Sequence, residues 1–214
     1  MLHTIDNARF WDGIARKYAA DRIKDMPGYE RTLERTKCLL SRSARVLEVG
    51  CGTGTSALAL APFVSRIVAT DVSSEMIAIA REKAVAQSCQ NAEFSVATAE
   101  RAPGSDGSYD AVLGFNILHL IADRASTLAR IHRLLKPNGL FISKTPCLSE
   151  MNPLIRYAVP VAQFLGKAPF VAFFTATELD AEIAGAGFTT IVRERHGSGR
   201  KDARIFVVAR RSEA

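Results

Sequence analysis

The sequence has few cysteines, and those present show no pattern. Its 214 residues include four, Cys38, Cys51, Cys89 and Cys147, with neither the paired spacing of a disulfide framework nor the spacing of metal ligands. This arrangement argues against a disulfide-stapled secreted domain, and it predicts no metal site. It favours a reduced, cytoplasmic setting.

Long apolar segments are also missing. The N-terminal MLHTIDNARFW lacks the basic and then apolar pattern of a signal peptide. The most apolar window, residues 154–174, is interrupted by Arg156, Pro160, Lys167 and Pro169, so we expect no membrane-spanning helix. With 48% hydrophobic and 23% charged residues, the chain has the composition of one globular domain.

Aromatic residues are scarce where positive charge gathers. The net charge is +6, and many basic residues lie near the C-terminus: Arg193, Arg195, Arg200, Lys201, Arg204, Arg210 and Arg211. Only Phe206 interleaves with them, whereas a basic nucleic-acid surface usually combines cations with aromatic side chains. We therefore expect solvated strand ends here and no nucleic-acid partner.

What the sequence does have is a glycine turn between two regular segments. The apolar residues within 46–49 predict a buried parallel strand. The run GCGTG, residues 50–54, follows, and its glycines permit positive φ and the close approach of a ligand. A helix then begins near Thr55 or Ser56, either of which suits the N-cap. Strand, turn and helix together predict a nucleotide-type crevice at the end of a parallel strand.

Two acids decide which ligand fits this crevice. The spacing is G-x-G-x-G, not the G-x-G-x-x-G of dinucleotide folds, and Glu48 stands two residues before Gly50. This carboxylate would repel a pyrophosphate but attract a cationic amino group. The next strand, 66–70, ends at Asp71, which suits a ribose diol or the N-terminus of the helix that follows. An ammonium and a ribose fit S-adenosylmethionine better than NAD.

Together these residues carry a family resemblance. EVGCGTG followed by ATDVSSEMI resembles the class I S-adenosylmethionine-dependent methyltransferases, in particular their small-molecule branch in ubiquinone and menaquinone biosynthesis. SYDAVLGFNILHLI and LLKPNGLFIS match the family's fourth and fifth strand regions, so the resemblance covers about residues 10–210. It implies an α/β, doubly wound, mostly parallel, Rossmann-like sheet of seven strands in the order 3-2-1-4-5-7-6, with strand seven reversed. It also implies S-adenosyl-L-methionine as the cofactor.

The resemblance further implies a set of cofactor contacts. Besides Glu48 and Asp71, these are Tyr18, Gly50, Cys51, Gly52, Gly54, Val72, Met76, Thr98, Ala99 and Phe115. Thr98 departs from the family pattern, because an aspartate usually stands there, two residues past the third strand at 92–96. A threonine hydroxyl accepts a hydrogen bond from the adenine amine more weakly than a carboxylate does.

The segment before the first strand, residues 5–40, reads as two helices separated at Pro27-Gly28. One face of the first helix carries the residues Phe10, Trp11, Ile14 and Tyr18. This helix either packs over the sheet edge or closes as a lid over the cofactor. The resemblance points to Tyr18 and Trp11 for the second role.

The tip of the fourth strand supplies the candidate catalytic residues. YDAVLGF, residues 109–115, is almost wholly apolar, as a central parallel strand should be. Strands one and four flank the topological switch point, so Asn116 and His119 should face the transferred methyl group. His119 would take a proton from a hydroxyl acceptor; the alternative is that it packs beside the next helix. NILH in place of N-P-P-[YF] argues against a base amine as the acceptor.

These elements divide the single domain, 1–214, into four parts: a helical lid at 1–42, a cofactor-binding core at 43–145, an insert at 146–174, and a helix with two strands at 175–214. The insert is rich in Leu, Ile, Val and Phe. Part of it should pack on the sheet, and the rest should line a pocket for an apolar, lipid-like or quinone-like acceptor.

Two functions of different classes remain open. One is an enzyme that moves a methyl group to an O, N or C atom of a small, apolar acceptor. The other is a cofactor-binding protein with little turnover. RNA or protein methylation is a further alternative that depends on the basic C-terminal stretch, and the sequence leaves monomer and homodimer open. An open pocket beside the cofactor would favour the small-molecule enzyme.

Overall fold

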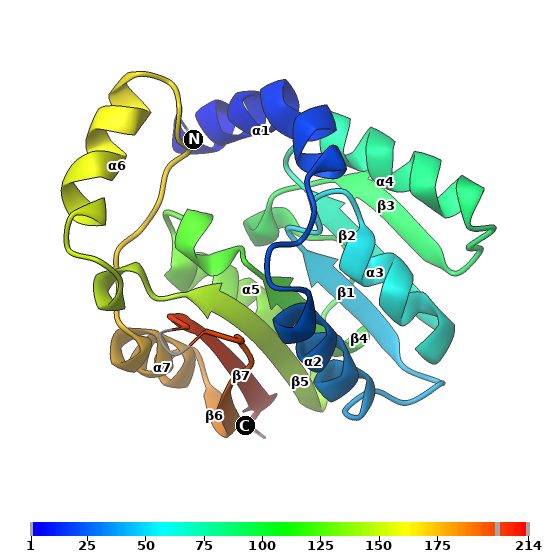
Figure 1. The fold of residues 1–214 in the computed structure, drawn as a ribbon. Coiled ribbons are helices and arrows are strands. Elements are labelled where there is room, and N and C mark those ends of the chain that lie inside the picture. Colours follow the sequence, from blue (N-terminus) through cyan, green and yellow to red (C-terminus); the bar gives the residue numbers. More distant parts are fainter. Residues whose placement is uncertain (1, 200–201, 213–214) are drawn as a thin grey trace.

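Seven strands pair into one sheet within residues 2–199 and 202–212, which are the residues that the computed structural model of the protein describes (Figure 1). The order β3-β2-β1-β4-β5-β7-β6 is the expected one. The strands are β1 (Arg45–Val49), β2 (Arg66–Asp71), β3 (Ala92–Val96), β4 (Tyr109–Phe115), β5 (Leu135–Pro146), β6 (Phe188–Arg195) and β7 (Arg204–Arg211).

Strand direction also follows the prediction. β1 pairs in parallel with β2 and β4, and β4 pairs in parallel with β5. β7 runs antiparallel to both β5 and β6, so strand seven is reversed. The central strands are apolar because both faces of the sheet are covered: β1 is buried from Val46 to Val49. The doubly wound α/β fold is therefore confirmed.

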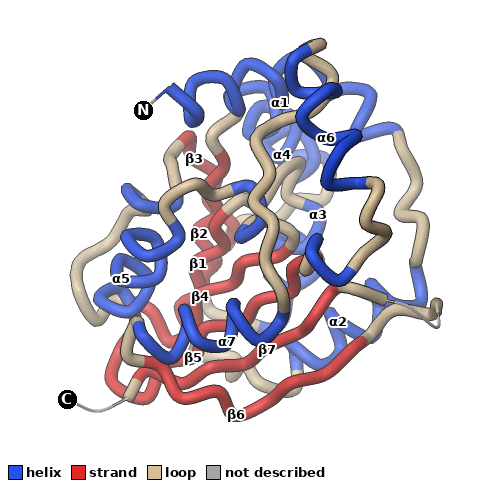
Figure 2. Tube along the Cα trace, turned by 90° about the vertical axis from the view of Figure 1, so that its left-hand side faces the viewer, coloured by secondary structure: helices blue, strands red, loops and turns tan. Residues whose placement is uncertain are grey.

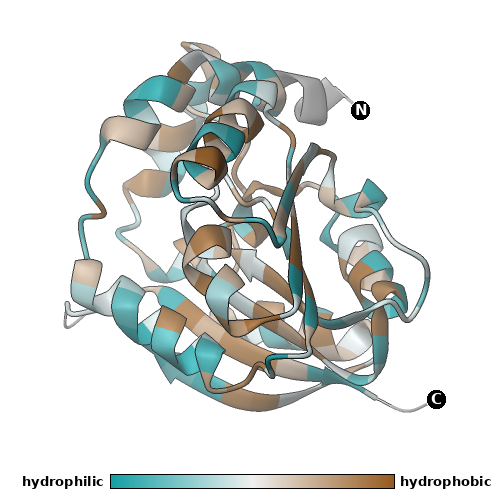
Figure 3. Ribbon diagram, turned by 90° about the vertical axis from the view of Figure 1, so that its right-hand side faces the viewer, coloured by the Kyte–Doolittle hydropathy of each residue, from teal (hydrophilic) through white to brown (hydrophobic). Residues whose placement is uncertain are grey.

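Helices cover both faces of the sheet (Figure 2). They are α1 (Leu2–Ala20), α2 (Met26–Lys37), α3 (Thr55–Leu60), α4 (Ser74–Ala86), α5 (Arg124–Leu134), α6 (Ile155–Phe164) and α7 (Ala176–Gly185). Side chains of α2, α3 and α4 pack with β1 and β4 in one buried cluster. The helices α5 and α7 pack on the other face. In Figure 3 the strands are largely brown, whereas the helices in front of them carry teal, polar segments.

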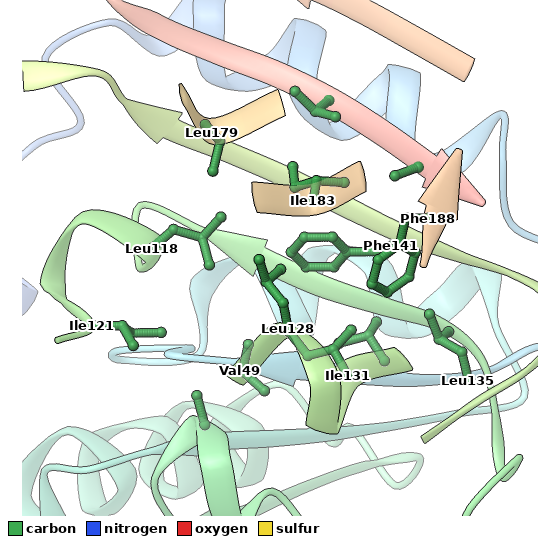
Figure 4. Close-up of a cluster of buried hydrophobic side chains, with 14 of the residues drawn as sticks. Val49, Leu118, Ile121, Leu128, Ile131, Leu135, Phe141, Leu179, Ile183 and Phe188 are labelled. Carbon is green, nitrogen blue, oxygen red and sulfur yellow. The ribbon is translucent and has the colours of Figure 1, made fainter. Parts of the chain in front are cut away.

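The core on the α5 and α7 face fixes the ends of β4 and β5 (Figure 4). Phe141 of β5 lies among Leu128 and Ile131 of α5 and Ile183 of α7, and all four are fully buried. Burial of side chains of this size stabilises the fold by about 1.5–3 kcal/mol each. This packing holds β5 against α5 and α7.

The local structure differs from expectation at three turns. The break between the first two helices lies at residues 21–25, and Pro27 stands in the first turn of α2, where its missing N–H costs nothing. The N-cap of α3 is Gly54, not Thr55 or Ser56. β5 begins at Leu135, so residues 136–139, KPNG, whose Pro and Gly are typical of a turn, lie inside an irregular start of that strand.

The insert at 146–174 also differs from expectation. It contains α6, none of whose residues is buried, and Figure 1 shows this helix apart from the sheet. The chain that follows α6 is attached by two hydrogen bonds: Phe170 N donates to Asn7 Oδ1 at 2.9 Å, and Ala172 N donates to His119 O at 2.7 Å. Core packing is therefore confined to the two ends of the insert, where Cys147 and Phe174 are buried.

Gly54 has a structural role that a substitution would expose. Its φ is +73°, and a Cβ there would lie 2.8 Å from Phe94 Cε1 and 2.9 Å from the Ala80 methyl group. We expect Gly54→Ala to lower the free energy of unfolding by about 2–5 kcal/mol, because backbone strain and overpacking add. Urea denaturation measures this change.

Gly107→Ala is the matched control. Its φ is +68°, but no atom lies within 4 Å of an added Cβ. The free energy of unfolding of this variant should fall only by the cost of backbone strain, about 1–2 kcal/mol. Equal losses in the two variants would show that the packing of Gly54 contributes nothing.

Candidate active site

A cavity of about 910 Å³ opens at the carboxyl ends of β1, β2 and β4. Its floor includes Glu48, Gly52 and Asp71, and α1 borders it through Trp11 and Tyr18. The helix after β1 covers one face of the sheet and the helix after β4 covers the other, so the cavity lies at the topological switch point. This volume is within the range of small-molecule and cofactor sites, about 300–1,000 Å³.

The glycine turn shapes the cavity floor. Gly50, Gly52 and Gly54 all have positive φ, as expected. They differ in surroundings, because a Cβ on Gly50 would strike Ile117 at 2.6 Å, whereas one on Gly52 would meet only the Tyr18 ring at 3.9 Å. Gly52 is thus the glycine that leaves room for a ligand. Gly54 does not line the cavity, so its expected place at the cofactor is not found; it packs between Phe94 and Ala80.

Asp71 holds the turn in place from the tip of β2. Its Oδ2 accepts a hydrogen bond from Gly52 N at 2.8 Å, and its Oδ1 accepts one from Ser73 N at 3.0 Å. Burial raises the pKa of this carboxyl, and the hydrogen bonds from Ser73 and Gly52 oppose the increase. A carboxylate has about four lone-pair sites, so Asp71 keeps acceptor capacity toward the cavity.

Glu48 is the most unusual group of the site. It is 2% exposed and lines the cavity, and its Oε2 has no hydrogen-bond partner in the described part of the chain. Burial, together with the negative charge of Asp71, raises the pKa of the Glu48 carboxyl to about 8. An unpartnered buried carboxyl is costly. A cationic ligand group would remove that cost, which fits the ammonium of S-adenosylmethionine.

Most of the other expected contact residues also border the cavity: Tyr18, Gly50, Cys51, Val72, Met76, Thr98, Ala99 and Phe115. They come from α1, the glycine turn, the segment after β2, the segment after β3 and the tip of β4. The fold therefore brings together residues that are up to 97 positions apart in the chain, from Tyr18 to Phe115. Cys51 is buried beside Glu48 and Asp71, which with burial raise its pKa well above the usual value, so its thiol stays neutral.

The helix α1 is held over the cavity by polar contacts. Asp12 Oδ1 accepts a hydrogen bond from Ser73 Oγ at 2.6 Å and one from Glu75 N at 3.1 Å, at the N-terminus of α4. The Trp11 and Tyr18 rings meet edge to face at 5.9 Å. This placement supports the lid interpretation over simple packing on a sheet edge.

The cavity also has walls that the sequence did not reveal. The connection between α1 and α2 contributes Asp21, Arg22, Ile23 and Lys24, and Met26, Tyr29 and Lys83 add to them. Residues 21–25 have no periodic pattern and no motif, so no sequence signal marks them. Only the return of the chain from α1 to α2 places this connection over the site.

His119 does not lie where the sequence predicted. It is absent from the residues that line the cavity, and its Nδ1 is 3.2 Å from Thr145 Oγ1 of β5. Burial lowers the pKa of His119 to about 4, so it stays neutral and a weak base near neutral pH. His119 lies in the short helical turn Leu118–Leu120, and its ring faces Thr145 of β5. Of the two candidate catalytic residues, Asn116 is the one that lines the cavity.

The insert does not reach the cavity either. No residue of 146–174 lines it, so the expected contribution of the insert to an acceptor pocket is not found there. Among the described residues, no cluster of His, Cys, Asp and Glu could hold a metal ion. Likewise, no helix in the described ranges is long and apolar enough to cross a membrane.

Comparisons with known proteins agree with this geometry. A family model described as a methyltransferase domain matches residues 46–139. A ubiquinone/menaquinone biosynthesis C-methyltransferase of Geotalea uraniireducens is 36% identical over 172 residues, which are 71% of this chain and 73% of that protein. The chain belongs to the class I S-adenosylmethionine-dependent methyltransferases. Its cofactor is accordingly S-adenosylmethionine, and the site described above fits that molecule.

Other similar proteins match over different shares of the chain. The uncharacterized methyltransferase YcgJ of Bacillus subtilis is 33% identical over 46% of the chain. Its crystal structure matches with a TM-score of 0.71 at 18% identity, covering 86% of this chain and all of that one. The crystal structure of the [4+2]-cyclase SpnF matches with a TM-score of 0.68 at 20% identity, covering 86% of this chain and 80% of that one. In the sequence alignments the chain spans only 39% and 53% of the length of two curated relatives.

The buried Glu48 predicts a distinctive pH dependence of stability. The folded protein keeps a proton on Glu48 up to about pH 8, whereas the unfolded chain releases it near the ordinary value of 4.5. The folded state thus binds more protons across this window, so stability falls as pH rises through it. Relative to Glu48→Gln, the ligand-free protein should lose on the order of a few kcal/mol between about pH 5 and pH 9. Urea denaturation of the parent and of Glu48→Gln at the two pH values tests this. An equal change in the free energy of unfolding of both proteins would contradict it.

Asp71 should be required for cofactor affinity. We expect Asp71→Ala to weaken the binding of S-adenosylhomocysteine by about 1–3 kcal/mol, because both the ribose acceptor and the support of Gly52 N are lost. Arg16→Ala is a control on α1, since the Arg16–Glu82 ion pair is exposed and outside the cavity lining. Calorimetric titration of both variants measures the effect. Equal affinities of the Asp71 variant and the parent for S-adenosylhomocysteine would show that Asp71 is not part of the cofactor site.

Proposed function

We propose that this methyltransferase transfers the methyl group of S-adenosylmethionine to a small, apolar acceptor. The observation that carries the proposal is the apolar part of the cavity lining. Besides the cofactor residues, it includes the apolar side chains of Trp11, Ile23, Met26, Ile117, Leu120 and Ile121. A cofactor-binding protein without turnover needs no such space, whereas an enzyme does.

The chemistry asks for alignment more than for acid or base groups. The cofactor supplies a methyl group on a sulfonium, which is already activated toward in-line displacement. The protein has to hold the acceptor in line and exclude water. Asn116, with φ of +53° at the tip of β4, is the polar residue that we place beside the acceptor, and α1 covers the site from outside.

The name of a similar protein gives a further reason to propose a small, apolar acceptor. The similar C-methyltransferase of Geotalea uraniireducens is named for ubiquinone/menaquinone biosynthesis, so a quinone-like or lipid-like acceptor is consistent with the lining. The carbon, oxygen or nitrogen that receives the methyl group is left open. The insert at 146–174 has no part in the acceptor site that we propose.

A nucleic-acid acceptor has less support. Several arginines of the basic C-terminal stretch are paired with acids: Arg193 with Asp180, Arg195 with Glu150, and Arg204 with Asp25 and Asp202. Paired cations are poor phosphate ligands because the acid neutralises them. Arg200 and Lys201 lie outside the described residues. A cofactor-binding protein without methyl transfer stays the second candidate, since the similar SpnF structure is described as a cyclase.

Labelled methyl groups test the proposal directly. The purified protein is incubated with radiolabelled S-adenosylmethionine and cell extract, which is then separated into lipid, small-molecule, RNA and protein fractions. We expect label in the lipid or small-molecule fraction. Gly52→Val should reduce it by about a hundredfold or more, because a branched side chain at φ of +53° enters the cofactor space. Asn116→Ala should reduce it by about tenfold with unchanged affinity for S-adenosylhomocysteine.

Two outcomes would contradict the proposal. Label confined to RNA or protein would replace the acceptor class. A protein that binds S-adenosylhomocysteine yet labels no fraction above the Gly52→Val background would instead be a cofactor-binding protein.

A further inference from the structure

A second, smaller cavity of about 80 Å³ adjoins the main one. The two cavities share the lining residues Ile23, Tyr29, Ser56, Phe115 and Asn116. The remaining lining of the smaller one, which we call the side cavity, is mostly polar and charged: Asp25, Thr32, Leu33, Lys144 and Arg204. A carboxylate or a single ring oxygen fits this volume, since one water molecule takes up about 30 Å³ in the liquid.

Lys144 is the notable member of the side cavity. It stands near the end of β5, opposite Phe115 in the sheet register, and Asn116 N donates to its carbonyl oxygen at 2.7 Å. The residue is only 6% exposed. Its Nζ donates to Gly28 O at 3.1 Å and to Thr32 Oγ1 at 2.9 Å. Both acceptors are neutral, and no ion pair of Lys144 is found among the described residues.

The nearby carboxylates act on the charge of Lys144 from a distance but form no hydrogen bond with it in the described part of the chain, although Asp202 Oδ2 has no partner there. Asp25 accepts hydrogen bonds from Gly28 N, Ser198 N and Ser198 Oγ, and it also pairs with Arg204. Asp202 pairs with Arg204 at 2.8 Å. Arg204 is therefore neutralised twice, whereas Lys144 has three N–H donors and only two partners in the described ranges. The side cavity holds a buried cation that lacks a directly bonded anion.

Thr32 fixes the position of this ammonium. Its hydroxyl donates to Gly28 O at 2.8 Å and lies 3.1 Å from His196 Nδ1, and His196 Nε2 lies 2.9 Å from Glu194 Oε2. The Lys144 side chain starts from β5, and its ammonium is held by residues of α2. The long side chain therefore does not move freely. A buried charge without a counter-ion is expensive, and burial accordingly lowers the pKa of Lys144. An anionic ligand oxygen would offset that cost.

We infer that the side cavity binds an anionic oxygen of the methyl acceptor, a carboxylate or a phenolate, with Lys144 as its counter-ion. This inference rests on the proposed function, because the acceptor body would occupy the main cavity beside Phe115 and Asn116. Lys144 then selects acceptors that are apolar in body but carry one acidic oxygen. A phenolate held there would also keep its electron density available to the ring that accepts the methyl group.

Paired probes test this charge preference. With S-adenosylhomocysteine bound, calorimetry compares benzoate with neutral benzamide, and 4-nitrophenolate with neutral 4-nitroanisole. The parent protein should bind at least one anion about tenfold or more tightly than its neutral partner. Preference in the first pair alone indicates a carboxylate, and preference in the second pair indicates a phenolate. The absorbance of 4-nitrophenol should also shift toward the ionised form on binding.

Substitution then assigns the preference to Lys144. Lys144→Gln keeps a hydrogen-bond donor but lacks the charge, so the preference should fall to within about twofold. Lys136→Gln is the matched control, because Lys136 lies at the start of the same strand and pairs with Asp110 at 2.7 Å. A role of Lys144 only in joining α2 to β5 would lower thermal stability without altering the preference. That outcome overturns the inference.

The remaining outcomes are also decisive. A parent protein that binds S-adenosylhomocysteine but prefers neither anion overturns the inference and leaves the proposed function intact, whereas loss of S-adenosylhomocysteine binding would count against the proposed function itself. If Lys144→Gln does not fold, a crystal structure of the parent with S-adenosylhomocysteine and the preferred anion replaces it. An anionic oxygen within hydrogen-bond distance of Lys144 Nζ supports the inference, and one bound elsewhere overturns it.

Discussion

The hydrogen bond from Gly52 N to Asp71 Oδ2 joins the two strand tips on which the site depends. It fixes the glycine turn after β1 against the end of β2, so that the turn presents its backbone to the cavity instead of closing over it. Gly50 and Gly54 support the same geometry by packing tightly against Ile117 and Phe94. Of these three glycines, Gly52 alone faces open space. The turn therefore needs glycine for two physical reasons: tight packing at Gly50 and Gly54, and room for a ligand at Gly52.

A second constraint is the burial of two ionisable groups that have no partner of opposite charge. Glu48 lines the main cavity with one oxygen unpartnered, and Lys144 lines the side cavity without a bonded carboxylate. Each group costs the folded protein free energy that a ligand of opposite charge would offset. Glu48 becomes negative when it ionises, whereas Lys144 becomes positive, so the two groups suit different ligands: an ammonium near the glycine turn and an anionic oxygen beyond Asn116.

Much of the site could be predicted because its residues follow strand ends in the sequence. Asp71, Thr98 and Phe115 are found at the cavity because the carboxyl ends of parallel strands meet at one edge. The same reasoning failed for His119, because the helical turn Leu118–Leu120 intervenes and rotates the side chain toward Thr145. Apolar composition misplaced the insert, since α6 leaves its apolar residues exposed.

The sequence by itself determined the doubly wound class of the sheet, the glycine turn and the kind of cofactor, because these follow from strand alternation and from motifs within short stretches, whereas the strand order followed from the family resemblance. Only the tertiary structure decided which polar groups share a cavity. Lys144 and Thr32 lie 112 positions apart, and β5 has to pack against α2 before they meet. The pKa values of Glu48 and His119 were likewise decided by burial, and burial depends on the packing of the whole chain.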